Sequence, residues 1–323
     1  MNMKGLICEK WGEIDDLIYG DLPMPDMDKD QIMIKVKAIG INFPDGLIVK
    51  GLYQFKPPFP FCPGGEVSGV VAAIGEEVKD VQVGDHVAAM TGWNGLAQYA
   101  VIQAADATVV PKEVPFADAA AMLYTYGTVK HAFDDRAKLK AGEKVAILGA
   151  AGGIGMAGID LATQIGAEVI ALASTQEKLD ACRQRGAHHT VNYLEQDVKT
   201  ALKALGGVDV VLDPVGGEAS EKAFRCLRWE GRHLVVGFTA GQIPKLPLNL
   251  ALLKGSSLVG VFFGRFKMEF PDDYKANNVS LIKDLAAGNL KPYIHKTYSF
   301  EEAKQAIKDI DNRKAIGKLV VVL

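Results

Sequence analysis

The chain has 323 residues, which at roughly 150 residues per domain favours two domains. Its 36 basic and 39 acidic residues give a formal net charge of −3, so no excess of positive charge indicates nucleic acid or an anionic membrane as a partner. No apolar run reaches the roughly 18 residues that span a bilayer, and the charged residues Glu9 and Lys10 come too early for a secretory signal. Four cysteines without paired spacing are typical of a reducing compartment, so we expect a cytoplasmic protein.

The first 120 residues are predicted to be rich in β-strands. Residues 31–38 alternate between polar and apolar with a period of two, as a half-buried strand does. Further strands are predicted over 67–74 and 86–90. The proline-rich segment Pro57–Pro63 excludes a helix or a central strand there.

From Ala117 onward the pattern changes, with helices predicted over 117–123 and 128–133. Five predicted strands then alternate with helices, over 145–149, 168–173, 208–213, 233–237 and 258–263. Such alternation predicts an α/β fold with a doubly wound parallel sheet.

The last 50 residues are predicted to return to the first domain. A helix is expected over 279–287, another helix from Glu301, and a terminal strand over 318–323. Because that strand is too short to begin a new domain, we expect it to complete the first one.

The segment Val145–Gly158 predicts a phosphate-binding turn. A buried strand over 145–149 runs into a glycine-rich bend, and a helix is predicted to begin at Ile154 or Gly155. Backbone N–H groups at such a helix N-terminus bind a pyrophosphate. A second strand after Gly166 completes a βαβ unit of about 30 residues, which predicts a dinucleotide cofactor. The working glycine frame is 149, 152 and 155, because it follows the strand directly.

The residues after the second strand favour NADPH over NADH. An NAD site places a carboxylate here, where it accepts a hydrogen bond from the ribose 2′-OH. Ala173 and Ser174 occupy that position instead, and Glu177 lies about one helical turn further on. Ser174 leaves room for a 2′-phosphate, Lys178 offers a positive charge, and Tyr193 can add a hydrogen bond from the neighbouring strand end.

These features, with several short motifs, resemble the zinc-free quinone oxidoreductases of the medium-chain dehydrogenase/reductase superfamily, the ζ-crystallin-like group. The resemblance covers essentially the whole chain. The motifs that carry it are Gly40–Asp45, Pro63–Gly69, Val83–Val87, Gly149–Gly155, Val236–Asn249 and the pair Gly317-Lys318.

The resemblance implies a GroES-like β-rich catalytic domain, built from residues 1–123 and 265–323, and a Rossmann NADPH-binding domain over 124–264. The active site is expected between them. A homodimer is also implied, with edge pairing through residues 257–263, an apolar strand that needs covering.

The resemblance also assigns positions to the cofactor. The pyrophosphate is expected at Gly152, Gly153 and Ile154, and the 2′-phosphate at Ser174, Lys178 and Tyr193. The nicotinamide end is expected near a third set of residues: Asn42, Thr128, Phe238, Phe262, Phe263 and Lys318.

No catalytic or structural zinc is expected. Zinc enzymes of this superfamily have a cysteine where this chain has Asn42 and a histidine where it has Gly65, although Glu66 remains. The histidines and cysteines are scattered, and fewer than three suitable ligands do not make a catalytic zinc site.

The predicted activity is transfer of hydride from NADPH to a quinone, an acceptor that needs no Lewis acid. Asn42 and Tyr53 are the candidate residues for the substrate, and Tyr53 is equally consistent with anchoring its loop. Alternatives are a reductase of α,β-unsaturated carbonyls or enoyl thioesters, and a non-catalytic binding or structural protein of ζ-crystallin type. The net charge of −3 argues against the RNA binding known in that group.

Overall fold

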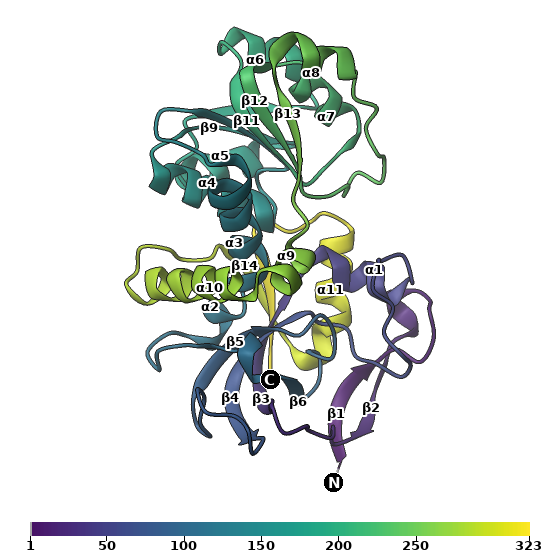
Figure 1. The fold of residues 1–323 in the computed structure, drawn as a ribbon. Helices are drawn as coiled ribbons and strands as arrows, with labels where there is room; N and C mark the ends of the chain where they lie inside the picture. Colours follow the sequence, from purple (N-terminus) through teal and green to yellow (C-terminus); the bar gives the residue numbers. More distant parts are fainter. Residues whose placement is uncertain (1) are drawn as a thin grey trace. The chain divides into compact units, whose positions relative to one another are not determined.

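The computed structural model describes residues 2–323 and divides into two compact units (Figure 1). The first unit comprises Met1–Tyr124 together with Asp272–Leu323, and the second comprises Thr125–Pro271. The predicted boundaries lie at 123/124 and 264/265, and the structure places them at 124/125 and 271/272.

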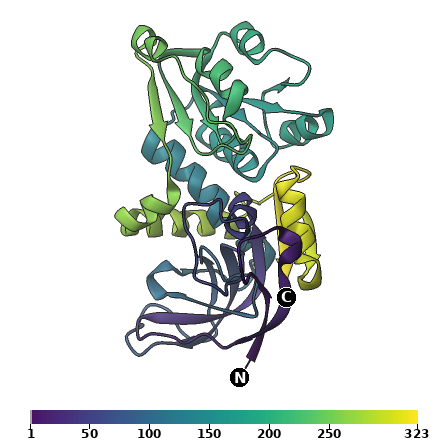
Figure 2. The same cartoon turned by 90° about the vertical axis from the view of Figure 1, so that its right-hand side faces the viewer.

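The first unit is built on a seven-stranded sheet in the order β14-β15-β3-β4-β5-β7, with β6 also paired to β3. Its strands are β3 (Gln31–Ile41), β4 (Glu66–Ile74), β5 (His86–Met90), β6 (Tyr99–Gln103), β7 (Thr108–Val109), β14 (Ile294–Ser299) and β15 (Lys318–Val322). The C-terminal strand β15 runs antiparallel to β3, so the C-terminal end of the chain returns to a sheet built mainly from its N-terminal part (Figure 2). A separate antiparallel pair, β1 (Asn2–Ile7) and β2 (Ile18–Pro23), was not predicted from the sequence.

Close approach of the backbone fixes the centre of this unit. A Cβ on Gly40, in β3, would lie 2.0 Å from the carbonyl oxygen of Ala120 and 2.7 Å from a carboxylate oxygen of Glu66, so no other residue fits there. The helices of the unit are α1 (Phe43–Val49), α2 (Phe116–Ala119), α10 (Pro271–Ala286, whose first residue belongs to the second unit) and α11 (Ala303–Asp311).

The second unit is a Rossmann fold, which confirms the predicted fold class. Six parallel strands lie in the order β10-β9-β8-β11-β12-β13. They are β8 (Lys144–Leu148), β9 (Glu168–Ala173), β10 (His189–Asn192), β11 (Val208–Asp213), β12 (Leu227–Val235) and β13 (Ser257–Gly260). The helices are α3 (Leu123–Lys130, beginning in the first unit), α4 (Gly153–Ile165), α5 (Gln176–Gln184), α6 (Val198–Ala204), α7 (Gly217–Phe224), α8 (Leu248–Lys254) and α9 (Phe263–Glu269).

The glycine-rich turn between β8 and α4 has the geometry that its spacing predicts. Gly149 has a φ of +60°, and Gly152 is the N-cap of α4. A Cβ on Gly155 would lie 2.3–2.4 Å from backbone atoms of Ala150. Gly158 has a separate role, because a Cβ there would lie 2.8 Å from Leu212 Cδ2 and would separate α4 from the sheet.

Several predicted boundaries differ from the structure; the strand predicted over 233–237, for example, begins six residues earlier, at Leu227. The strand predicted over 258–263 ends at Gly260, and Phe263 begins α9 and is buried. The short apolar run continues through both elements, so apolar character alone does not separate them. The helix predicted from Val279 begins eight residues earlier at Pro271, where proline and the acidic residues Asp272 and Asp273 favour a first turn.

Within residues 2–323, none of the helices combines the length and the apolar character needed to cross a bilayer.

The turn geometry predicts that Gly155→Ala lowers the free energy of unfolding by about 2–3 kcal/mol, because the new methyl group overlaps rigid backbone. Urea unfolding of the full chain measures this. Gly260→Ala is the matched control: no atom lies within 4 Å of its new Cβ, so a change of at most about 0.5 kcal/mol is expected. Equal stability of the two variants would contradict this account of the turn.

Candidate functional site

The turn after β8 presents the start of α4 at the carboxyl edge of the parallel sheet. Gly152, Gly153 and Ile154 are half-buried, between fully buried neighbours on either side. Gly153 and Ile154 are the first two residues of a 13-residue helix, whose N-terminal N–H groups favour an anion. The turn therefore has the local geometry that the expected pyrophosphate site requires.

The three residues predicted for the 2′-phosphate lie around the carboxyl end of β9. Tyr193 follows β10, and its backbone N–H donates to the carbonyl oxygen of Ala173 at 3.1 Å, which places it next to Ser174. Lys178 lies in the first turn of α5, where its backbone N–H donates to the Thr175 hydroxyl at 3.3 Å. Thr175 is thus the helix cap, so the Ser174 hydroxyl is not used for capping. The local geometry suits a phosphate monoester at this position.

The four residues of the second unit predicted for the nicotinamide end have different surroundings. Thr128 is buried on α3, whereas Phe238 and Phe262 are 39% and 48% exposed. Phe263 packs against α3, because a Cβ on Gly127 would lie 2.6 Å from its ring. The exposed pair offers aromatic surface to a ligand, while the position of Phe263 indicates a packing role.

A buried polar cluster lies at the centre of the first unit. The Lys318 ammonium donates to Asn42 Oδ1 at 2.6 Å and to Glu66 Oε2 at 2.9 Å, and all three side chains are at most 6% exposed. Asn42 Nδ2 donates in turn to Glu66 Oε2 and to the carbonyl oxygen of Gly40, each at 3.1 Å. Both amide hydrogens of Asn42 are therefore used inside the protein, and its amide orientation is fixed.

Asp45 joins two backbone segments beside this cluster. One carboxylate oxygen accepts from the Asn42 N–H at 2.7 Å, and the other accepts from the N–H groups of Gly64 and Gly65 at 3.2 and 3.0 Å. Burial raises the pKa of Asp45 to about 6, against the lowering effect of these N–H groups and of Lys318. Asp45 is thus the third residue of α1 in a capping box with Asn42, and it also holds the Gly64-Gly65 turn.

Tyr124 connects the cluster to Tyr53, a candidate substrate residue. The backbone N–H of Tyr124 donates to Glu66 Oε1 at 2.8 Å. Its phenol is hydrogen-bonded to Tyr53, and burial, together with Tyr53 and the nearby carboxylates, raises the pKa of Tyr124 well above its usual value of 10. Tyr53 also packs on the core of the first unit. The Tyr53 hydroxyl is therefore hydrogen-bonded to the buried phenol of Tyr124.

The residues at the positions where zinc enzymes of the resembled superfamily hold their metal do not fit a zinc ion. Gly65 has no side chain, Asn42 is a poor ligand whose oxygen faces Lys318, and the Glu66 carboxylate is paired with that ammonium. Within residues 2–323, no three His, Cys, Asp or Glu residues cluster in a way that could hold a metal.

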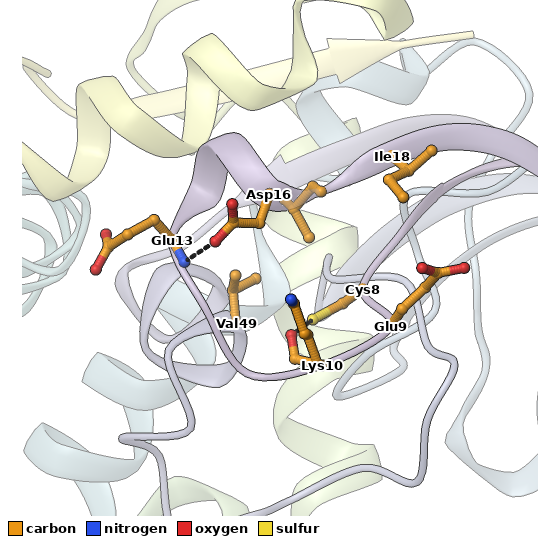
Figure 3. Close-up of a pocket in the computed structure, with 8 residues that line it drawn as sticks. Cys8, Glu9, Lys10, Glu13, Asp16, Ile18 and Val49 are labelled. Atoms are coloured by element: carbon orange, nitrogen blue, oxygen red, sulfur yellow. Dashed lines mark hydrogen bonds between the residues drawn. The ribbon is translucent and has the colours of Figure 1, made fainter.

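A hollow of about 240 Å³ lies in the first unit, away from the predicted site residues (Figure 3). Charged side chains of Glu9, Lys10, Glu13 and Asp16 surround it, with Val49 at its base. Val49 ends α1, whereas Asn42 precedes the same helix, so the hollow and the polar cluster lie at opposite ends of α1.

Several residues of these sites were missed from the sequence. Glu66 was noted only as the remnant of a zinc motif, and its partner Lys318 lies 252 positions away. A second buried group, Asp213, His233 and Ser220, forms beneath the carboxyl ends of β11 and β12. The only local signal for it is an aspartate that ends a strand before Gly216-Gly217.

Comparisons with known proteins agree with this geometry. Residues 28–113 match the family model of the alcohol dehydrogenase GroES-like domain, and residues 153–283 match that of the zinc-binding dehydrogenases. The chain is 36% identical to quinone oxidoreductase-like protein 2 of Rattus norvegicus, over 91% of this chain and 85% of that one.

Solved structures give the same result. The Escherichia coli quinone oxidoreductase complexed with NADPH matches with a TM-score of 0.90 at 25% identity, over 100% of this chain and 99% of that one. The CurK enoyl reductase matches with a TM-score of 0.87 at 26% identity, over 99% and 98%.

The buried cluster predicts that Lys318→Met lowers the free energy of unfolding by about 3–5 kcal/mol, because it leaves the Glu66 carboxylate buried and unpaired. Chemical unfolding of the full chain measures the loss, and the double variant Lys318→Met, Glu66→Gln should recover most of it.

Lys4→Met is the control, because Lys4 forms an exposed pair with Asp21 and should cost at most about 1 kcal/mol. Similar small losses for Lys4→Met and Lys318→Met would show that the buried pair does not stabilise this unit.

Proposed function

Because the chain belongs to the quinone oxidoreductase-like family of the medium-chain dehydrogenase/reductase superfamily, we propose that it reduces quinones with NADPH and without zinc. The proposal rests on two local environments, one in each unit: the residues at the end of β9 and the buried cluster around Lys318. One suits a 2′-phosphorylated dinucleotide, and the other has a lysine ammonium where the zinc enzymes of the superfamily need metal ligands.

The preference for NADPH rests on Ser174, Lys178 and Tyr193. No carboxylate stands at the end of β9 to bind a ribose 2′-OH or to repel a 2′-phosphate. Tyr193 is 37% exposed, so its hydroxyl is accessible to a ligand. The similar Escherichia coli protein was solved with NADPH, which supports the same choice here.

The preference for a quinone rests on the donor set of the first unit, which offers Lys318 and its partners in place of metal ligands. Oxidation of an alcohol requires a Lewis acid or a base to take the hydroxyl proton, and the donor set around Lys318 is closed to a metal. Bound NADPH supplies a hydride, and the reduced quinone takes a proton from water or from a protein hydroxyl. The residues of the chain then need only orient the two reactants and exclude water from the reacting atoms.

The second candidate is reduction of an α,β-unsaturated carbonyl. The phenol of Tyr124 is hydrogen-bonded to Tyr53, so hydroxyl groups stand at the candidate substrate residue, although the raised pKa of Tyr124 makes its own phenol a weak acid. An enoyl acceptor needs a proton donor for its α-carbon. The similarity to the CurK enoyl reductase supports this alternative.

An NADPH-oxidation assay that compares quinones with enals and enoyl thioesters decides between the two functions. We expect turnover of quinones, with a lower KM for NADPH than for NADH. Ser174→Asp should raise the KM for NADPH at least about tenfold, the equivalent of 1.4 kcal/mol, because it places a carboxylate against the 2′-phosphate.

Glu177→Gln, a charge change on the exposed first turn of α5, is the control and should leave KM within about twofold. Turnover of enals or enoyl thioesters alone, or a lower KM for NADH, would reject the first proposal.

We also propose a homodimer that pairs through the outer edge of β13. This strand ends the sheet, so its outer backbone groups are open to another strand. Large apolar side chains lie exposed around it, with Leu258 on β13 at 50%, Leu252 on α8 at 81% and Trp229 on β12 at 70%. Together they form a surface that a second copy can cover.

Light scattering tests the dimer. The wild-type chain should have the mass of two copies, and Leu258→Lys should shift it to one by burying a charge at the contact. Leu194→Lys, at a side chain that is 71% exposed elsewhere in the same unit, should leave the dimer intact. A wild-type monomer, or equal dissociation of both variants, would refute the proposed interface.

A further inference from the structure

Three polar side chains meet beneath the carboxyl ends of β11 and β12, shielded from solvent. Asp213 ends β11, His233 lies in β12 and Ser220 lies on α7, and each is at most 1% exposed. His233 Nε2 is 3.0 Å from Asp213 Oδ2 and 3.3 Å from Ser220 Oγ. The proposed hydride transfer does not use any of the three directly.

The group is not arranged for nucleophilic catalysis. In a serine hydrolase the histidine stands between serine and aspartate and uses a different ring nitrogen for each. Here both partners face the same nitrogen, and the serine is closed to any substrate. The contacts of the group instead suit a role in positioning other residues.

Asp213 fixes two loops at once. Its Oδ1 accepts hydrogen bonds from the backbone N–H groups of Val215 at 2.9 Å and Gly216 at 2.8 Å, which hold the turn after β11. Its own carbonyl oxygen accepts from the Val236 N–H at 2.9 Å, where the loop after β12 begins. Burial favours the protonated carboxyl, but the hydrogen bond and charge of His233 outweigh it and lower the pKa of Asp213.

The turn that Asp213 holds lies between two parts of the candidate dinucleotide site. On one side, Val215 Cγ2 would lie 2.8 Å from a Cβ built on Gly149, the first glycine of the phosphate-binding turn. On the other side, Phe238 Cδ1 would lie 2.9 Å from a Cβ built on Gly216. The backbone N–H of Ala240 also donates to the carbonyl oxygen of Val215 at 2.9 Å. A shift of this turn would therefore alter the contacts of the glycine-rich turn at Gly149 and of the loop that contains Phe238 and Ala240.

We propose that Asp213, His233 and Ser220 are positioning residues for the nicotinamide-side half of the dinucleotide, acting through the turn Val215–Gly216. The inference rests on the proposed NADPH-dependent function. The proposed role distinguishes the two halves of the dinucleotide. The adenosine half is expected at the end of β9, which β8 separates from β11 in the sheet order. Loss of the cluster should weaken binding of the whole dinucleotide and leave binding of its adenosine fragment unchanged.

The test is Asp213→Asn in the full chain, with the Kd measured for NADPH and for 2′,5′-ADP. The amide keeps the shape of the carboxylate but loses its charge and turns an N–H toward neighbouring donors. We expect the Kd for NADPH to rise about tenfold or more, with the Kd for 2′,5′-ADP within about twofold. A general loss of structure would raise both.

Asp209→Asn is the matched control, at the opposite end of the same strand. Its carboxylate accepts from the Lys144 N–H at 2.7 Å and from Arg228 Nη1 at 3.0 Å, so the same change removes similar bonds away from the site. Both Kd values should stay at the wild-type level. If Asp213→Asn does not fold, Ser220→Ala is measured in its place. We then expect a smaller rise in the Kd for NADPH and an unchanged Kd for 2′,5′-ADP.

Unchanged NADPH affinity, or equal losses for NADPH and 2′,5′-ADP, would overturn the inference while leaving the proposed function intact. A wild-type chain that does not bind NADPH would instead reject the proposed function, and the positioning role with it.

Discussion

The ion pair between Lys318 and Glu66 joins the two ends of the chain in the centre of the first unit. Lys318 begins the C-terminal strand β15 and Glu66 begins β4, with β3 between them in the sheet. Two buried charges are costly unless they are paired and hydrogen-bonded, and here the ammonium and the carboxylate satisfy each other and the Asn42 amide. Residues from the N-terminal and the C-terminal part of the chain thus both contribute to this pair and to the sheet around it.

The same pair decides what chemistry the first unit can support. The Lys318 ammonium binds the oxygen atoms of Asn42 and Glu66, so these atoms are already used within the protein. It also fixes Glu66, which holds the backbone of Tyr124 and so the phenol next to Tyr53. Transfer of hydride to an electron-poor acceptor is consistent with such an arrangement, because the hard step is supplied by the dinucleotide.

Sequence reasoning succeeded where function depends on neighbours along the chain. The turn Gly149–Gly155 is defined by its own backbone geometry, so its glycines indicate it directly. Ser174 and Tyr193 end adjacent parallel strands, and strand order in this fold follows general rules.

It failed where partners are distant or where apolar runs are ambiguous. Lys318 was proposed as a cofactor residue, and nothing local shows that its ammonium is buried against Glu66, 252 positions away. Asp213 and His233 face each other only because β11 and β12 are parallel neighbours in register. Phe263 was assigned to a strand, because an apolar run of this length does not distinguish a strand end from the start of a buried helix.

The most direct test of this account is an anaerobic titration of NADPH with a quinone, using full-length protein dialysed against a chelator. The account predicts that one NADPH is oxidised per quinone consumed, at the same rate before and after chelation. A reaction that requires added zinc, or that releases semiquinone radicals detectable by electron paramagnetic resonance, would contradict a metal-free hydride transfer.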